Sequence, residues 1–349
     1  MKSIVTLEHS RKAIGRAGDI LVQEELLTEE YNDALEKLSN WRASHVYPLL
    51  IIHKLLLSRA KKIDKKVLSA QRLKRIPSIV NKLKRYKSMK LHRLQDIGGC
   101  RVILSDINQV YDLKKDITKN FSNHLLVKEN DYISEMKDSG YRGIHLIYKY
   151  QGKTHTSFNN HLIEIQLRTQ LQHAWATSVE ILGTYLNESL KSSQGNQEVL
   201  DFFKKVSLLF SFAEKNSIDM NTDSMKALKK SVLDDIKQLD IITKLKAFSV
   251  TTKSISKGDK KDGYSLLNLD TSKMVVNIMH FKKVDLEYAV QEYLRLERES
   301  GSMNSDNIVL VSTQSVHNLK KAYPNYFADS NKFISNLETL LEKSFNKTE

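Results

Sequence analysis

The chain has 349 residues, enough for two domains or for one domain with an appendage. Hydrophobic residues make up 40% of it and charged residues 28%, as in ordinary soluble globular proteins. The single cysteine, Cys100, excludes an internal disulfide and a multi-cysteine zinc site, and we expect it to be a buried structural residue.

The net charge of +14 comes from one part of the sequence. Residues 54–93 contain fifteen Lys and Arg and one acidic residue, Asp64, so the rest of the chain is balanced. Such a concentration predicts a polyanionic partner (nucleotide phosphates, RNA or an anionic membrane), or else a solvated basic helix face. The window lies just before the acidic segments described below, which favours phosphate binding.

The sequence opens without a signal-peptide pattern, and its most apolar run, residues 46–57, is interrupted by His53 and Lys54. That run is too short to span a bilayer. We therefore expect a cytoplasmic protein without a membrane partner.

The first half of the chain shows a regular succession of apolar patterns. They predict mostly helical structure in residues 1–68, then a basic helix over 72–87 with Pro77 in its first turn. The elements expected next are a buried strand at 97–104, a helix at 110–121, a short strand at 125–127, a polar loop at 131–140, a strand at 143–150 and a turn at 151–160.

Residues 161–169 alternate strictly between apolar and polar side chains. One face carries His161, Ile163, Ile165 and Leu167, and the other carries Glu164, Gln166 and Arg168. This alternation predicts a strand with an apolar back on the core and a polar front facing a cleft. An acid, an amide and a base on one open face can together bind a metal, orient a hydroxyl and hold a phosphate.

The second half begins with a helix from Thr169 to about Leu186, in which we expect His173 and Trp175 to pack in the core. A break at 192–195 separates it from a helix that ends near Phe212. The expected elements after that are a helix at 225–239, a polar loop at 254–263, strands at 264–269 and 274–280, a helix at 286–297, a strand at 308–312 and a final helix.

These patterns predict an α/β protein with a mixed sheet flanked by helices. We expect an N-terminal helical region (1–44), a core domain (45–220) and a smaller C-terminal α/β module (221–349). The module carries no motif with a recognisable chemistry, so a regulatory or interaction role is expected for it.

Four segments carry polar residues whose types make chemical sense together: 72–78 with Lys82 one turn later, 95–101, 137–145 and 164–169. They read R-x-K-x-x-x-S, D-x-x-G-x-R, G-Y-x-x-x-H and E-x-Q-x-R-T. In order and spacing they resemble the synthetase domain of the RelA/SpoT family, the alarmone synthetases. The resemblance covers about residues 45–215, with Trp175 in the expected place, and implies a nucleotidyltransferase-like core.

The resemblance also implies an activity, which is transfer of the β,γ-pyrophosphate of ATP to the ribose 3′-hydroxyl of GDP or GTP. Asp96 and Glu164 would be the catalytic acids and the ligands of Mg²⁺, with Glu164 alternatively the general base. The implied ATP-binding residues are Arg72, Lys74, Ser78, Lys82 and Arg101, the two arginines stacking on adenine. The implied acceptor-binding residues are Lys137, Tyr141, His145, Gln166 and Arg168, with Tyr141 stacking on the base.

One geometric conflict arises within this set. Strict alternation would place Arg101 on the opposite face from Asp96. Both can reach one site if the strand begins after Asp96 or if a bulge forms, which Gly98 and Gly99 would permit.

The chain departs from the family pattern at several points, and these leave the acceptor open. Arg142 and Gly143 follow Tyr141, the Tyr-Lys pair expected after Trp175 is missing, and no hydrolase motif precedes the core. The 3′ end of tRNA, as in toxic members of the family, and adenosine nucleotides are alternative acceptors. A catalytically silent nucleotide- or RNA-binding regulator is a third hypothesis. Small relatives assemble into homo-oligomers, so a homo-oligomer is an expected partner state.

Overall fold

The computed structural model describes residues 5–23, 29–121, 123–186, 188, 190, 195–215, 222–250, 263–270, 275–299, 308–313 and 330–342. In the first part of the chain the elements are α1 (Arg11–Leu21), α2 (Glu29–Ala43), α3 (Val46–Ile63), β1 (Leu68–Leu73), α4 (Ile76–Arg85), η1 (Leu91–Arg93), β2 (Gly98–Leu104), α5 (Ile107–Asn120), β3 (Leu125–Asp131), β4 (Ile144–Lys149), η2 (Thr156–Phe158), β5 (Leu162–Thr169) and α6 (Gln170–Leu186). They are followed by α7 (Gln197–Lys215), α8 (Asp223–Leu239), α9 (Ile241–Val250), β6 (Gly263–Asp270), β7 (Val275–Lys282), η4 (Lys283–Asp285), α10 (Leu286–Glu299), β8 (Ile308–Thr313) and α13 (Asn331–Leu341).

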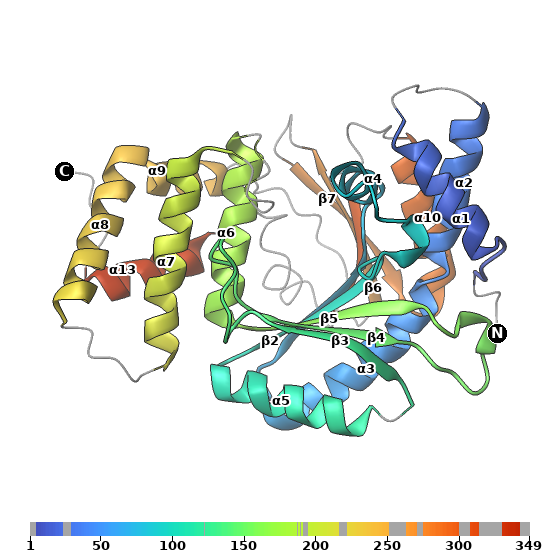
Figure 1. Cartoon of the computed structure of the whole chain (residues 1–349), viewed down its shortest axis with the longest axis horizontal. Coiled ribbons are helices and arrows are strands. Elements are labelled where there is room, and N and C mark those ends of the chain that lie inside the picture. Colours follow the sequence, from blue (N-terminus) through green and yellow to red (C-terminus); the bar gives the residue numbers. More distant parts are fainter. Residues whose placement is uncertain are drawn as a thin grey trace.

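A mixed sheet forms the centre of the fold, as the sequence predicts. Among the described residues it has five strands in the order β1-β2-β5-β4-β3, with β2 and β5 parallel and the other neighbours antiparallel. Helices α3 and α5 lie against one face of this sheet (Figure 1). Strand β5 alternates as expected, since Ile163, Ile165 and Leu167 are fully buried on that face.

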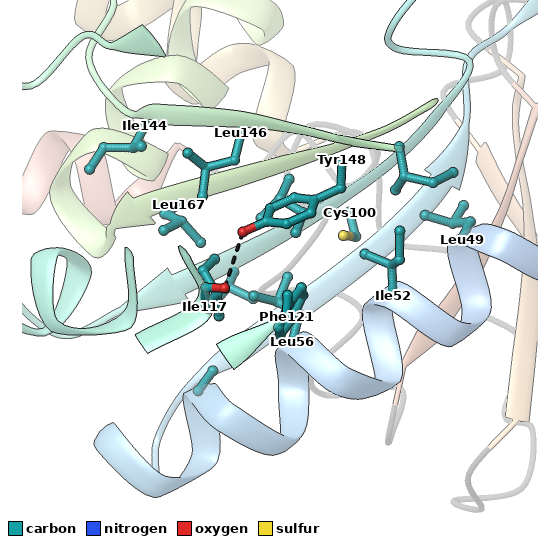
Figure 2. Close-up of a cluster of buried hydrophobic side chains, with 14 of the residues drawn as sticks. Leu49, Ile52, Leu56, Cys100, Ile117, Phe121, Ile144, Leu146, Tyr148 and Leu167 are labelled. Atoms are coloured by element: carbon teal, nitrogen blue, oxygen red, sulfur yellow. Dashed lines mark hydrogen bonds between the residues drawn. The ribbon is translucent and has the colours of Figure 1, made fainter. Parts of the chain in front are cut away.

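The core between the sheet and the two helices is closely packed (Figure 2). Leu49, Ile52 and Leu56 of α3 meet the apolar side chains of the central strands. Tyr148 is also buried there, and its hydroxyl donates a 3.1 Å hydrogen bond to the carbonyl of Ile117 in α5, which satisfies its polar group inside the core. Cys100 is buried in the same cluster, as expected. The opposite face of the sheet is therefore left for the polar side chains.

One expected helix is wrong at its start. The basic helix predicted over 72–87 begins only at Ile76, and Arg72 lies in strand β1, which pairs antiparallel with β2. Residues 70, 71 and 73 are buried, so pairing and burial override the helical pattern of the basic side chains. Strand β3 also extends four residues beyond its predicted end at Val127.

The C-terminal residues share hydrophobic cores with the residues before them. Helices α8, α9 and α13 pack with α6 and α7 in one cluster, where Phe333 of α13 meets Phe203 and Phe210 of α7 with ring centroids 5.8 and 5.7 Å apart. The three-stranded sheet β7-β6-β8 and α10 add Leu266, Tyr293 and Ile308 to the central core. The boundary at 220/221 stays a prediction about sequence organisation, since packing crosses it.

Most of the loop expected at 254–263 and most of the break expected at 192–195 lie outside the described residues. Within the described ranges, none of the helices combines the length and apolar character needed to cross a bilayer.

The shared cluster predicts one cooperative unfolding transition. Replacing Phe333, which is 1% exposed, with alanine should lower the free energy of unfolding by about 3–5 kcal/mol through the cavity it leaves. Urea unfolding followed by tryptophan fluorescence and by circular dichroism would measure this, and the two signals should coincide. Tyr288→Ala, at a residue that is 62% exposed, is the matched control and should change stability by less than about 0.5 kcal/mol. Separate transitions for the two halves of the chain would contradict the expectation.

Candidate active site

The register of the central strands brings the polar side chains of distant segments onto one face. Gly99 pairs with Glu164, Arg101 pairs with Gln166, and His145 pairs with Gln166 from the other side. Directly paired residues project to the same face of a sheet. This face is opposite to the one that packs on α3 and α5.

Asp96 lies just before β2, at the edge of this face, and is held by two lysines. Lys74, between β1 and α4, and Lys82, on α4, donate to Asp96 Oδ2 over 3.0 and 2.9 Å. Burial alone would raise the pKa of the Asp96 carboxyl, but the two ammonium groups outweigh it and lower the pKa below its usual value. Asp96 Oδ1 is buried and accepts no hydrogen bond from the described residues.

Glu164 is the second carboxylate, and its oxygens are held within the sheet face. His145 Nδ1 lies 2.9 Å from Glu164 Oε1, and the Gln166 amide donates to Oε2 over 2.7 Å. Burial would raise the pKa of Glu164, but the hydrogen bond and charge of His145, with help from Gln166 and Lys74, lower it to about 2. The negative charge of Glu164 partly opposes the effect of the two lysines on the pKa of Asp96, so the two acids belong to one electrostatic site.

Tyr141 connects this site to the loop that precedes β4. Its hydroxyl accepts from Arg168 Nη2 and Nε over 3.0 and 3.2 Å and lies 2.5 Å from His145 Nε2. Arg168 also donates to the Gln166 amide oxygen over 3.1 Å. The ammonium of Lys137 lies 4.1 Å from the centre of the Tyr132 ring and 5.4 Å from that of Tyr141. Burial lowers the pKa of Lys137.

Three of the expected residues lie further from this hydrogen-bonded set. Arg72 pairs with Gly99 and shares the open face, two strands or about 10 Å of backbone from Glu164. Arg101 is half-buried on the same face, and its charge acts on Tyr141. Ser78 is half-buried in the first turn of α4.

The conflict between Asp96 and Arg101 is resolved in the way that the sequence permits. Strand β2 begins at Gly98, so Asp96 precedes the strand and does not follow its alternation. An added Cβ at Gly99 would lie 3.9 Å from Glu164 Oε2, at ordinary van der Waals distance, so Gly99 directly borders this carboxylate. His173 and Trp175 are buried as predicted, and the Trp175 indole donates to the carbonyl of Phe203.

Two groups of residues at or beside the site were not predicted from the sequence. Tyr132 stands edge-on to Tyr141 and His145, with ring centroids 5.9 and 5.4 Å apart, and helps to line a cavity formed by residues 129–132 and 134–139. Glu214 of α7 forms a buried ion pair with Arg142, over 2.5 Å. The only sequence signal for this pair is the unusual arginine after Tyr141, because Glu214 lies far along the chain.

A comparison of sequences identifies the central part of the chain. A family described as the region found in RelA/SpoT proteins matches residues 71–188. The chain therefore carries a RelA/SpoT region. All four predicted segments lie within this RelA/SpoT region, and so do both acids, Asp96 and Glu164.

Individual relatives match over a similar stretch. The GTP pyrophosphokinase YjbM of Bacillus subtilis (strain 168) is 37% identical over 111 residues, which is 30% of this chain and 51% of YjbM. The GTP pyrophosphokinase YwaC of the same organism is 37% identical over 112 residues, or 30% of this chain and 52% of YwaC. The chain thus spans about half the length of these relatives.

A solved structure was also found to be similar. It is small alarmone synthetase 1 from Bacillus subtilis bound to its product pppGpp, with 24% identity and a TM-score of 0.43, covering 52% of this chain and 94% of that one.

The low pKa of Glu164 predicts a specific dependence of stability on pH. Its folded pKa of about 2 lies below the ordinary value of 4.5, so its stabilising contribution is full above about pH 4.5 and is lost as the pH falls toward 2. The stability advantage of the wild type over Glu164→Gln should therefore shrink by up to about 3 kcal/mol across this window. Urea unfolding of both proteins at several pH values measures it. A difference that stays constant with pH would contradict the assignment.

Proposed function

We propose that this chain is an ATP-dependent pyrophosphokinase that transfers the β,γ-pyrophosphate of ATP to the ribose 3′-hydroxyl of GDP or GTP. The observation that carries the proposal is the meeting of two carboxylates, Asp96 and Glu164, with the lysines of the basic segment on one sheet face. The likeness to the GTP pyrophosphokinases YjbM and YwaC over the RelA/SpoT region supports it.

The donor side of the site would consist of the basic segment and Asp96. Lys74 and Lys82 are placed to neutralise the ATP phosphates, and Ser78 lies in the first turn of α4 between them. Arg72 and Arg101, on neighbouring strands of the open face, would stack on the adenine through their planar guanidinium groups.

The carboxylates fit a magnesium ion. Asp96 Oδ1 is a buried oxygen without a hydrogen bond from the described residues, and carboxylate oxygens are the ligands that Mg²⁺ prefers. Mg²⁺ is commonly held by one or two carboxylates and takes its remaining ligands from phosphates and water. When bound by Asp96 and Glu164, Mg²⁺ would neutralise charge on the transferred phosphates.

The acceptor side would be formed by the Tyr141 loop and the polar face of β5. Tyr141 would stack on the acceptor base, while Lys137 and His145 would bind its phosphates. Gln166 and Arg168 hold Glu164 and the Tyr141 hydroxyl in place. In the reaction, the 3′-oxygen bonds to the β-phosphorus of ATP, the bond from that phosphorus to the α,β-bridging oxygen breaks and AMP leaves, and the proton of the 3′-hydroxyl passes to water.

The position of Glu164 leaves two roles open, metal ligand and general base. A loose phosphoryl-transfer transition state needs little proton removal from the nucleophile. We therefore assign Glu164 to binding the metal and orienting the site.

Removal of either carboxylate should abolish most of the transfer. With ATP labelled at the γ-phosphate, Mg²⁺ and GDP, GTP or AMP, the wild type should produce a labelled guanine nucleotide and AMP. Asp96→Asn and Glu164→Gln should lower the rate by about 10²- to 10³-fold, because electrostatic stabilisation of the transferred group is lost. Asp116→Asn, at a half-buried acid on α5 that pairs with Arg59, is the control and should keep the activity. Product from AMP alone would favour adenosine alarmones as the products, and a wild type without product from any nucleotide would leave tRNA as the acceptor or a silent regulator.

A second candidate acceptor, the 3′ end of tRNA, is favoured by the surface beside the site. Lys84 and Lys87 are exposed near the end of α4, with the exposed Tyr86 between them. Tyr86 acts electrostatically on Lys137, so this surface adjoins the acceptor side. Cations with an interleaved aromatic ring are suited to a nucleic-acid backbone and its bases.

The two acceptors predict different effects of surface charge. If tRNA is the acceptor, Lys84→Ala with Lys87→Ala should weaken tRNA labelling several-fold and reduce its salt dependence, while any transfer to GDP is unchanged. Lys61→Ala with Lys62→Ala, on α3 at the opposite face of the sheet, removes the same charge and should have no such effect. Equal labelling of tRNA by both double variants would exclude this surface as the tRNA contact.

A further inference from the structure

The loop of residues 137–143, which carries Tyr141 and is called the acceptor loop below, packs directly on helix α7. Ser207 of α7 donates a hydrogen bond to the carbonyl of Gly140, and its hydroxyl also lies 3.7 Å from the Met136 sulfur. Gly140 has a φ of +84°, and an added Cβ would lie 3.0 Å from the Cα of Lys204. The loop therefore needs glycine here both for its backbone conformation and for the close approach to α7.

Glu214, at the end of the same helix, joins this loop to strand β5. Its carboxylate pairs with Arg142 and also accepts from the Thr169 hydroxyl and, over 3.2 Å, from the Gln172 amide. The side chains of Arg142 and Glu214 are only 3% and 8% exposed. The pair is thus a buried charge pair in which the carboxylate of Glu214 gains additional hydrogen bonds, while Arg142 Nη2 is buried without a partner among the described residues.

Two of the residues that contact Glu214, Arg142 and Thr169, directly follow two residues that meet at the site. Arg142 follows Tyr141, and Thr169 follows Arg168, whose guanidinium donates to the Tyr141 hydroxyl. One carboxylate thereby fixes the chain on both sides of the contact between Arg168 and Tyr141. A buried ion pair adds little net stability compared with apolar packing, so its effect falls mainly on geometry.

We propose that Arg142 and Glu214 are positioning residues that place Tyr141 for the acceptor nucleotide. This inference rests on the proposed function, because it assigns the pair to the acceptor half of that reaction. Neither residue touches the nucleotide. Both act through Tyr141 and the loop that carries it.

The test compares this ion pair with another on the same helix. Glu214→Gln removes the charge, and Arg142→Met with Glu214→Leu replaces the pair by apolar side chains that avoid an uncompensated buried charge. The control is Asp235→Asn, which breaks the 2.8 Å pair that joins Lys205 of α7 to Asp235 of α8. Each protein is assayed for the KM of the acceptor, the KM of ATP and kcat, and for hydrogen–deuterium exchange of residues 137–143.

For Glu214→Gln and the double variant we expect the KM of the acceptor to rise about tenfold or more, because small misplacements of a positioning group have large effects. The KM of ATP should be unchanged, and exchange in residues 137–143 should accelerate. Asp235→Asn should change neither the acceptor KM nor the exchange of the loop.

Two results would overturn the inference: loop exchange equal to that of the wild type in both variants, or equal increases in KM for acceptor and ATP. A wild type that transfers pyrophosphate to no acceptor would instead overturn the proposed function, and loop exchange alone would then decide whether the pair anchors the loop.

Discussion

The parallel pairing of β2 with β5 is the constraint on which the rest of the site depends. It sets Gly99 opposite Glu164 and Arg101 opposite Gln166, and it leaves Asp96 just outside the strand on the same side. Parallel strands require a crossover, which here runs through α5, β3 and β4, and that crossover delivers the Tyr141 loop and His145 to the neighbouring strand. A shift of one residue between β2 and β5 would turn Glu164 into the apolar core.

Charge balance explains why both acids can lie on a partly buried surface. Asp96 is matched by two ammonium groups, and Glu164 by an imidazole and an amide. Buried charges without such partners would be strongly unfavourable. Under the proposed function, a magnesium triphosphate brings a cation for Asp96 together with anions for Lys74 and Lys82. The site can then exchange its internal partners for substrate while its net charge remains compensated.

The sequence was sufficient for those parts of the fold where apolar periodicity and burial agree. Strand β5, helix α5 and the buried strand β2 were predicted from their apolar residues, whereas the start of β2 after Asp96 was one of two arrangements that the sequence left open. Strand β1 was missed because its identity depends on pairing with β2, a contact that local periodicity does not encode. The members of the site were found by their chemical types, but the hydrogen bonds from Arg168 and His145 to Tyr141 required coordinates.

Glu214 shows why the remaining part of the site lay beyond sequence reasoning. It lies outside residues 71–188 and carries no motif, yet its carboxylate contacts both Arg142 and Thr169. Helix α7 is itself packed against Phe333 of α13, so the place of the acceptor loop depends on a core that includes the end of the described chain. Residues that bind substrate are confined to the RelA/SpoT region in our proposal, whereas residues that position them extend well past it. A change in the packing of α13 on α7 would therefore be transmitted to Tyr141 through Glu214 and Arg142, without any change in the residues that bind ATP.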